Sequence, residues 1–351
     1  MNIRRAAAAV LLGVCGVLTS TAALAYSKVV VFGDSLSDNG NLSSLFAGFV
    51  PSPLVYDDGR FSNGEVAVEV LAETLGVPLE DHAYGGALTG VNNQFESMTS
   101  LVANTGMKSQ VSSYLDGLAS SGLTADANAL FVVWGGGNDI LAAVTNGKTF
   151  GLTDLIATAV NNLRTEVQSL YSAGARDFLV PLLPDLGQTY YGTSGQISAS
   201  FLSSLTDRFN SSLTMVMQSL DFNLTGLNIT LFDTQGTLNT VRADILAGGG
   251  NVTDRCWSGD YLNVFGGTAC SNPDAYFLYD TVHPTARVHQ AVGEAMAAAV
   301  GATASTTAVP EPSVAVMALV GGLVLLVTRH RLRQRQVQRQ TAHTETGLLA
   351  A

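Results

Sequence analysis

Short apolar runs alternate with longer amphipathic segments through most of this chain. The short runs are rich in β-branched residues and predict five strands, at residues 28–32, 79–83, 129–134, 177–183 and 227–232. The longer segments carry apolar residues at helical spacing and predict helices at residues 65–75, 107–118, 152–173, 198–220 and 285–300. This alternation is typical of βαβ units around a parallel sheet, so we expect an α/β fold.

Two interruptions modify this pattern. Pro184 ends the fourth predicted strand, and Pro181 inside that strand weakens its last part because proline cannot donate to a sheet. Residues 248–272 begin with three glycines and lack a clear period, so we expect an irregular loop there.

The N-terminus has the three regions of a secretory signal peptide. Arg4 and Arg5 precede an apolar run at residues 6–17, and small residues follow up to Ala25. We therefore expect residues 1–25 to be removed by signal peptidase. An uncut membrane anchor is the alternative, but this run is shorter than the ~20 residues that span a bilayer.

The C-terminus has the features of a second sorting signal. A linker of small residues from position 302 leads to Val-Pro-Glu-Pro at 309–312, an apolar run at 314–327 and a basic cluster at 329–335. Residues 313–328 are predicted to be a short transmembrane helix with its basic flank in the cytoplasm. An ordinary tail anchor would have the same apolar and basic regions.

The Pro-Glu-Pro, the apolar helix and the arginines together resemble the PEP-CTERM sorting tail of Gram-negative bacteria. That resemblance implies an exosortase-type processing enzyme and a transient membrane anchor at residues 302–351. It also implies a final location in the cell envelope, at the cell surface or outside the cell.

The body between these signals, residues 26–301, is long enough for one large α/β domain. Residues 26–310 hold 10 Lys and Arg against 26 Asp and Glu, a formal charge of −16. Nucleic-acid binding needs a basic surface, so this composition argues against it.

Two cysteines, Cys256 and Cys270, remain once Cys15 is removed with the signal. In an oxidising compartment we expect them to form a disulfide, worth about 3 kcal/mol for a loop of this size. Two free thiols are the alternative. A metal site is not expected, because no CxxC pair or histidine cluster accompanies these cysteines.

A candidate nucleophile follows the first predicted strand. The run Val-Val-Val-Phe ends in Gly33-Asp34-Ser35, which places the Ser35 hydroxyl at the carboxyl edge of the sheet. Open α/β sheets bind ligands at that edge, and a serine there is a nucleophile if a base is supplied. The chain has no G-x-S-x-G, so the elbow of the α/β-hydrolases does not apply. An ordinary strand-to-loop turn is the alternative.

The candidate base is His283 in Asp280-Thr-Val-His283-Pro-Thr. An aspartate three residues earlier can accept a hydrogen bond from the ring and stabilise the imidazolium. His82 beside Asp81 is the main rival. His289 lies inside a predicted helix without a local aspartate, and the remaining histidines lie in the C-terminal tail.

Two glycine-rich turns after predicted strands are candidates for an oxyanion hole. One contains Gly136, Gly137 and Asn138, and the other contains Gly85 and Gly86. Glycines let backbone N–H groups approach a substrate closely, and the Asn138 carboxamide can donate to an oxyanion. Simple glycine-rich turns are the alternative, and neither run has the pattern of a phosphate loop.

These motifs together resemble the GDSL (SGNH) hydrolases, especially the longer branch with plant GDSL lipases and bacterial haemolysin-type enzymes. The resemblance rests on VFGDSLSDNGN, GRFSNGEVAVEVLAETLG, AYGGALTG, WGGGND, GARDFLVPLLPDLG and DTVHPT. It implies a flavodoxin-like three-layer α/β/α fold with Ser35 as nucleophile and Asp280 and His283 completing a triad. The Ser35 amide, Gly86 and Asn138 would form the oxyanion hole, with Gly85 as the alternative to Gly86.

The implied activity is hydrolysis of carboxylic esters or lipids without a metal or organic cofactor. The same machinery would serve a phospholipase, an acyltransferase or a polysaccharide O-deacetylase, and a non-catalytic surface binding protein is a further alternative. Many relatives have Phe-Trp where this chain has Leu278 and Tyr279, and Asn where it has Asp81-His82. We expect these departures to reshape the pocket.

Overall fold

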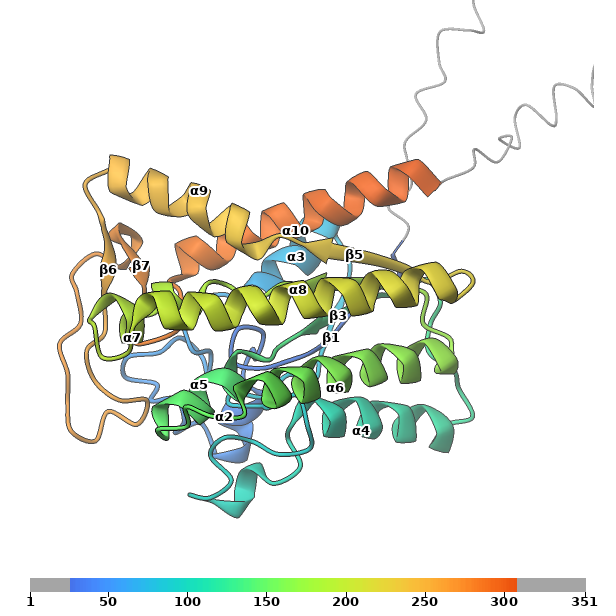
Figure 1. Cartoon of the computed structure of the whole chain (residues 1–351), viewed down its shortest axis with the longest axis horizontal. Coiled ribbons are helices and arrows are strands. Elements are labelled where there is room, and N and C mark those ends of the chain that lie inside the picture. The colour runs from blue at the N-terminus through green and yellow to red at the C-terminus, as the bar shows by residue number, and fades with distance from the viewer. Residues whose placement is uncertain (1–25, 308–351) are drawn as a thin grey trace, which may run out of the picture. The chain divides into compact units, whose positions relative to one another are not determined.

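A five-stranded parallel sheet forms the centre of the domain (Figure 1). The computed structural model of the chain describes residues 26–307, with side chains through residue 301. The strands are β1 (Val29–Gly33), β2 (Leu79–Asp81), β3 (Leu130–Trp134), β4 (Asp177–Pro181) and β5 (Asn228–Phe232). They lie in the order β2-β1-β3-β4-β5, and every neighbouring pair is parallel. This is the flavodoxin-like order, which confirms the predicted fold class.

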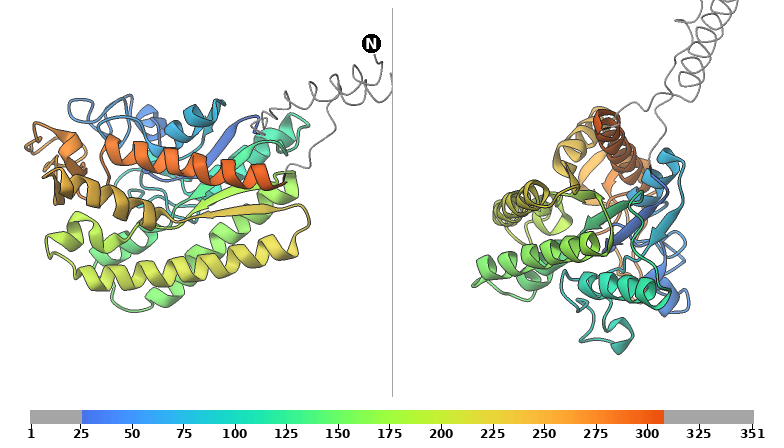
Figure 2. Two further views of the ribbon diagram at one scale, coloured as in Figure 1. Left: turned by 90° about the horizontal axis from the view of Figure 1, so that it is seen from above. Right: turned by 90° about the vertical axis from the view of Figure 1, so that its right-hand side faces the viewer.

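Helices cover both faces of this sheet (Figure 2). On one face lie α4 (Met107–Ser120), α6 (Leu152–Ala173) and α8 (Ala199–Asn223); on the other lie α3 (Ala67–Leu75), α9 (Thr234–Ala247) and α10 (Ala286–Thr307). Successive strand residues point to opposite faces, so a fully buried strand contributes to both layers. In β1, Val30 and Phe32 join the first layer, whereas Val29 and Val31 join the second.

The predicted strands and long helices are all present, and most of their ends differ by only a few residues. β4 ends at Pro181, in agreement with the expected effect of that proline. α10 continues to Thr307 rather than ending near residue 300.

Several shorter elements were not predicted. They are α2 (Asn41–Leu45), α5 (Gly137–Thr145), α7 (Tyr190–Thr193), the 3-10 turns η1 (Ser100–Val102), η2 (Leu186–Gln188) and η3 (Pro273–Ala275), and the strands β6 (Asn251–Arg255) and β7 (Tyr276–Leu278). The longer helix α9, given above, was not predicted either. The expectation of an irregular loop over 248–272 was wrong in its first part, because β6 pairs there with β7 in a small parallel sheet.

The proposed sorting signals, residues 1–25 and the tail with its predicted transmembrane helix at 313–328, lie outside the described residues. Within 26–307, no helix is long and apolar enough to cross a membrane.

Candidate active site

The Ser35 hydroxyl lies two residues beyond the end of β1, at the carboxyl edge of the sheet. The turn is closed by the Asp34 carbonyl, which accepts the N–H groups of Ser37 and Asp38. Gly33 has to be a glycine, because a Cβ there would lie 2.8 Å from the carbonyl oxygen of Trp134 on β3. The tight contact between the two strand ends therefore fixes where the serine leaves the sheet.

A buried glutamine on α4 also holds this strand end. Gln110 Oε1 accepts the N–H of Gly33 at 3.0 Å, and its Nε2 donates to the Gly33 carbonyl at 2.9 Å. Sequence reasoning did not identify Gln110, because the contact joins residues 77 positions apart.

His283 contacts both partners proposed for it. Its Nε2 lies 2.7 Å from Ser35 Oγ, and its Nδ1 lies 2.8 Å from Asp280 Oδ2. A proton on Nδ1 donates to the carboxylate and leaves Nε2 free to accept from the serine hydroxyl. The structure thus brings Ser35, His283 and Asp280 together in a nearly buried row.

The Asp280 carboxylate is held in its charged form. Burial alone would raise its pKa, but the His283 imidazole and the N–H groups of Val282 and His283 keep the pKa below its ordinary value. Oδ1 accepts both of these N–H groups at 2.9 Å. A buried carboxylate with this many donors stays ionised and fixes the histidine ring.

Tyr56 is a further member of the site that sequence reasoning did not identify. Its Oη donates to Asp280 Oδ2 at 2.9 Å. Burial, reinforced by the negative charge of Asp280, raises the Tyr56 pKa well above its ordinary value, so the phenol keeps its proton and remains a donor. The rings of Phe61 and Tyr261 flank His283, with centroids 5.1 and 5.8 Å from the imidazole.

The glycine turn at 85–86 has one engaged and one unengaged N–H. The Gly85 N–H donates to Asp38 Oδ2 at 2.7 Å, whereas no hydrogen bond is found for the Gly86 N–H among the described residues. Gly86 has φ +78°, and a Cβ there would come within 2.7 Å of Asn93 and Phe95. The geometry therefore favours Gly86 over Gly85 as a donor toward a substrate.

Asn138 lies at the start of α5, beside the nucleophile. It lines the same cavity as Ser35 and His283, and its Nδ2 donates to the Ala87 carbonyl at 3.1 Å. That bond uses one of the two carboxamide protons and leaves the other for an oxyanion.

Neither rival histidine contacts the serine. His82 bonds Glu80 at 3.1 Å and stacks on Phe32. His289 accepts the N–H of Ala67 through Nδ1, and burial, with the nearby His283, lowers its pKa to about 3. It therefore stays neutral inside the fold.

Asp38 ties the nucleophile loop to the glycine turn. Its carboxylate accepts the N–H groups of Gly40, Asn41, Leu42 and Gly85. Burial outweighs these bonds and raises the Asp38 pKa to about 6. One side chain thus holds the loop that carries Ser35 and the glycine turn together.

Cys256 and Cys270 form a disulfide in the structure. The bridged segment is joined to the residues before Asp280, because the Cys256 N–H donates to the Leu278 carbonyl and the Trp257 N–H donates to that of Tyr279. The disulfide therefore supports the strand that delivers Asp280.

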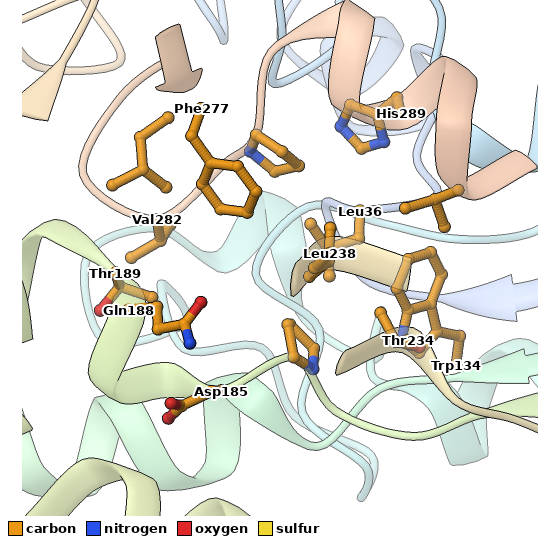
Figure 3. A pocket seen from close by; sticks show the side chains of 14 residues that line it. Leu36, Trp134, Asp185, Gln188, Thr189, Thr234, Leu238, Phe277, Val282 and His289 are labelled. Carbon is orange, nitrogen blue, oxygen red and sulfur yellow. The ribbon is translucent and has the colours of Figure 1, made fainter. Parts of the chain in front are cut away.

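A crevice lies next to the nucleophile cavity. Figure 3 shows the side chains that line this crevice. Its cavity volume is about 40 Å³, and its walls are largely apolar. We call it the apolar crevice and define it by Leu36, Trp134, Leu238, Phe277, Val282 and Val292. Leu36, Trp134 and Val282 also line the cavity of Ser35, so the two spaces are neighbours with a common wall.

Three buried polar atoms on the walls of this crevice have no partner: Trp134 Nε1, Thr234 Oγ1 and His289 Nε2. Because His289 Nδ1 is an acceptor, the neutral ring carries its proton on Nε2. Within residues 26–301 we find no group of three or more His, Cys, Asp or Glu side chains arranged to hold a metal ion.

Comparison with known proteins agrees with this geometry. Residues 29–296 match the profile of the family described as GDSL-like Lipase/Acylhydrolase. The thermolabile hemolysin of Vibrio parahaemolyticus is 32% identical over 284 residues, which cover 77% of this chain and 63% of that protein. Esterase EstA of Pseudomonas aeruginosa is 32% identical over 353 residues, covering 89% of this chain and 52% of the esterase.

The phosphatidylcholine-sterol acyltransferase of Aeromonas hydrophila is 35% identical over 170 residues, which cover 47% of this chain and 46% of that enzyme. The chain therefore spans between about half and two thirds of the length of these relatives.

Proposed function

Because the chain belongs to the GDSL-like lipase/acylhydrolase family, we propose that it hydrolyses carboxylic esters through an acyl-enzyme on Ser35. The observation that carries the proposal is the 2.7 Å contact between His283 Nε2 and Ser35 Oγ, backed by Asp280 on the other ring nitrogen. A nucleophile, a base and a group that orients the base are the three parts that acyl transfer requires.

In the first half-reaction, Ser35 Oγ attacks the ester carbonyl and its proton moves to His283 Nε2. Asp280 stabilises the imidazolium, and its own carboxylate stays ionised because of its N–H donors. Collapse of the tetrahedral intermediate breaks the ester C–O bond. The leaving alcohol takes the proton from His283, and the acyl group remains on Ser35.

In the second half-reaction, water attacks the acyl-enzyme while His283 accepts one of its protons. The acid leaves as Ser35 regains a proton from His283. In both steps the Ser35 and Gly86 N–H groups and the Asn138 carboxamide would stabilise the oxyanion. Loss of one such donor typically costs about 2.7–4 kcal/mol in the barrier.

The apolar crevice supports an ester whose acyl part is a hydrocarbon chain. It lies next to the cavity of Ser35 and presents leucine, valine, phenylalanine and tryptophan side chains. Burial of each methylene there would contribute about 0.8 kcal/mol to binding.

Transfer of the acyl group to an alcohol is a second candidate activity, favoured by the likeness to the Aeromonas acyltransferase. It uses the same acyl-enzyme, and in the second half-reaction an alcohol attacks in place of water. A phospholipase or polysaccharide O-deacetylase activity would also keep the triad. Mass spectrometry of the products, with lipids, sterols and acetylated polysaccharide offered together, separates these reactions.

Export and tail processing are also part of the proposal. The Cys256–Cys270 disulfide supports an oxidising compartment, where such bonds persist. The N-terminal residues would be cut by signal peptidase. The tail would anchor the chain in the membrane until an exosortase-type enzyme cuts it, leaving the protein in the cell envelope, at the surface or outside the cell. Mass spectrometry of the mature protein from each cell fraction tests both cuts.

The test of the reaction is Ser35→Ala assayed with short and long p-nitrophenyl esters. We expect turnover to fall to background and labelling by a fluorophosphonate probe to disappear. Ser37→Ala is the matched control, because Ser37 lies in the same loop and its hydroxyl makes no hydrogen bond. Unchanged turnover in Ser35→Ala would refute the assignment, and a folded wild type that neither turns over nor labels would favour a binding protein.

A further inference from the structure

Two loops near the triad expose several large hydrophobic side chains. The end of α2 and the loop after it expose Leu45, Phe49 and Leu54, and the loop between β6 and β7 exposes Leu262, Val264 and Phe265. Phe265 is 92% exposed, Leu54 82% and Phe49 71%. We call these six residues the two-loop patch. Single exposed hydrophobic residues are common, but six on adjoining loops mark a surface that meets something apolar.

The two loops are joined to each other. The Ser52 N–H donates to the Tyr261 carbonyl at 2.7 Å. Phe46, Val50 and Tyr261 face inward and pack together around Leu42 and Phe61. The loops thus have their own small core, and the outward side chains are not needed to hold them.

The two-loop patch borders the reaction centre. Leu262 directly follows Tyr261, whose ring lies 5.8 Å from that of His283. The first loop ends at Tyr56, which bonds Asp280. A surface that docks on this patch would therefore lie next to the triad.

The charges in and around the two loops indicate which kind of surface the two-loop patch binds. Residues 39–56 and 261–273 contain no charged side chain. The residues that directly flank them are acidic, Asp38, Asp57, Asp260 and Asp274. Arg60, the nearest basic residue in the sequence, forms ion pairs with Asp57 and Asp58, so it leaves no free positive charge there. The whole chain has a formal charge of −11. An anionic membrane would repel this face, whereas a zwitterionic lipid surface would accept its apolar side chains without that cost.

We propose that the two-loop patch docks the protein on a zwitterionic lipid surface. Apolar side chains of this kind bind at the boundary between headgroups and acyl chains in peripheral membrane proteins. The docking on lipid is independent of the proposed esterase function. Only the further step, that the bound lipid is also the substrate, rests on that function.

The first experiment measures whether the side chain at position 265 of the full-length protein inserts into lipid vesicles. Phe265→Trp and, as a matched control, Phe222→Trp are each made in a Ser35→Ala background, which removes turnover. Phe222 is 88% exposed in the last turn of α8, where the chain leads into β5 at the opposite edge of the sheet (Figure 1). The two native tryptophans are buried and give a constant background.

Vesicles of brominated phosphatidylcholine should quench the fluorescence of the Phe265→Trp protein well beyond that of the control. Vesicles in which brominated phosphatidylglycerol replaces half of the brominated phosphatidylcholine should quench it less, and equal or stronger quenching by them would overturn the preference for a zwitterionic surface. Equal quenching at both positions, or none at either, would overturn the proposal. Because no turnover is needed, this result stands apart from the fate of the esterase assignment.

The second experiment uses turnover. The double variant Phe49→Ser/Phe265→Ser should lose about tenfold or more of its activity on phosphatidylcholine vesicles, since each buried phenylalanine contributes strongly. Its turnover of soluble p-nitrophenyl acetate should not change. The control, Met215→Ser/Phe222→Ser on α8, should keep both activities. A wild-type dimer in ultracentrifugation that the Phe49/Phe265 variant abolishes would instead assign the patch to a second copy and overturn the proposal.

Discussion

Tyr56 donates a hydrogen bond to Asp280 across 224 positions of the chain, at 2.9 Å. The carboxylate therefore has two side-chain partners on one oxygen, because Oδ2 also lies 2.8 Å from His283 Nδ1. Tyr56 holds the carboxylate in place, and among the described residues it makes no hydrogen bond to Ser35. Its role is that of a positioning residue for the proposed base.

Replacing Tyr56 with Phe tests this role. Removal of a hydrogen bond to a charged group typically costs about 1.5–3 kcal/mol, so we expect kcat to fall by about tenfold or more while KM stays close to wild type. A purely structural role would lower the melting temperature without this separation of kcat from KM. Tyr276→Phe, a tyrosine on β7 that does not bond Asp280, is the control, and equal kcat values in the two variants would contradict the prediction.

Local motifs were enough to name residues that lie together in the site. Gly-Asp-Ser after an apolar strand and Asp-x-x-His before a helix are both contained in short stretches. The parallel sheet brings strand ends to one edge, so such stretches meet there. Tyr56 and Gln110 gave no such signal, since their roles depend on contacts 224 and 77 positions away.

The missed helix α9 shows the same limit for the fold. Its first turns contain Thr234, Gly236, Thr237 and Asn239, which are weak helix formers. The helix is started by the Asp233 side chain, which accepts the Gly236 N–H, and it packs on the sheet through Leu238, Val241 and Ile245. Tertiary packing here outweighs local propensity, and only the folded sheet supplies that packing.

The disulfide should matter for activity as well as stability. In Cys256→Ser/Cys270→Ser we expect the free energy of unfolding to fall by about 3 kcal/mol, the value for closing a loop of this size. The bridged segment bonds the backbone of Leu278 and Tyr279, just before Asp280, so kcat should fall as well. Chemical denaturation and ester turnover measure the two effects. A variant with full stability and full activity would contradict the prediction.

Burial of Asp81 should make the protein less stable as the pH rises. Burial is the main cause that raises the Asp81 pKa from 3.8 to about 8. Between these values the folded state binds a proton that the unfolded state lacks, so the free energy of unfolding decreases from pH 4 toward pH 8. Burial also raises the pKa values of Asp34, Asp38 and Asp139 to about 6. These three groups therefore also lower the free energy of unfolding as the pH rises from about 4 to 6.

Asp81→Asn removes the largest of these contributions. It keeps an oxygen acceptor for only one of the N–H groups of Asn39 and Ala83, which donate to different oxygens of the carboxylate, so the variant also loses one hydrogen bond at every pH. We expect a flatter dependence of stability on pH and a variant more stable than wild type at pH 8. At pH 8, removal of this carboxylate adds to the free energy of unfolding in proportion to the rise in the Asp81 pKa, at roughly 1.4 kcal/mol per pH unit. Urea denaturation at pH 5, 6.5 and 8 measures it. Asp116→Asn, on α4, is the control, and parallel curves for wild type and Asp81→Asn would refute the assignment.

The apolar crevice predicts how acyl-chain length affects turnover. Leu238 on α9 lines the crevice and is 7% exposed, so Leu238→Trp should fill the space beyond the nucleophile cavity. We expect p-nitrophenyl acetate to be cleaved as before, because its acyl group is too short to reach the crevice. For the octanoate ester, kcat/KM should fall about tenfold or more, since each methylene left out of the crevice costs about 0.8 kcal/mol.

Overpacking a core typically lowers the free energy of unfolding by about 1–3 kcal/mol. Both assays should therefore be run well below the melting temperature of the variant. Leu246→Trp is the matched control, because Leu246 lies on the same helix and is 55% exposed. If Leu238→Trp changes kcat/KM for acetate and octanoate by the same factor, the crevice does not bind the acyl chain. A selective loss for the longer ester, absent from Leu246→Trp, would place the chain between α9, β7 and the His283 loop.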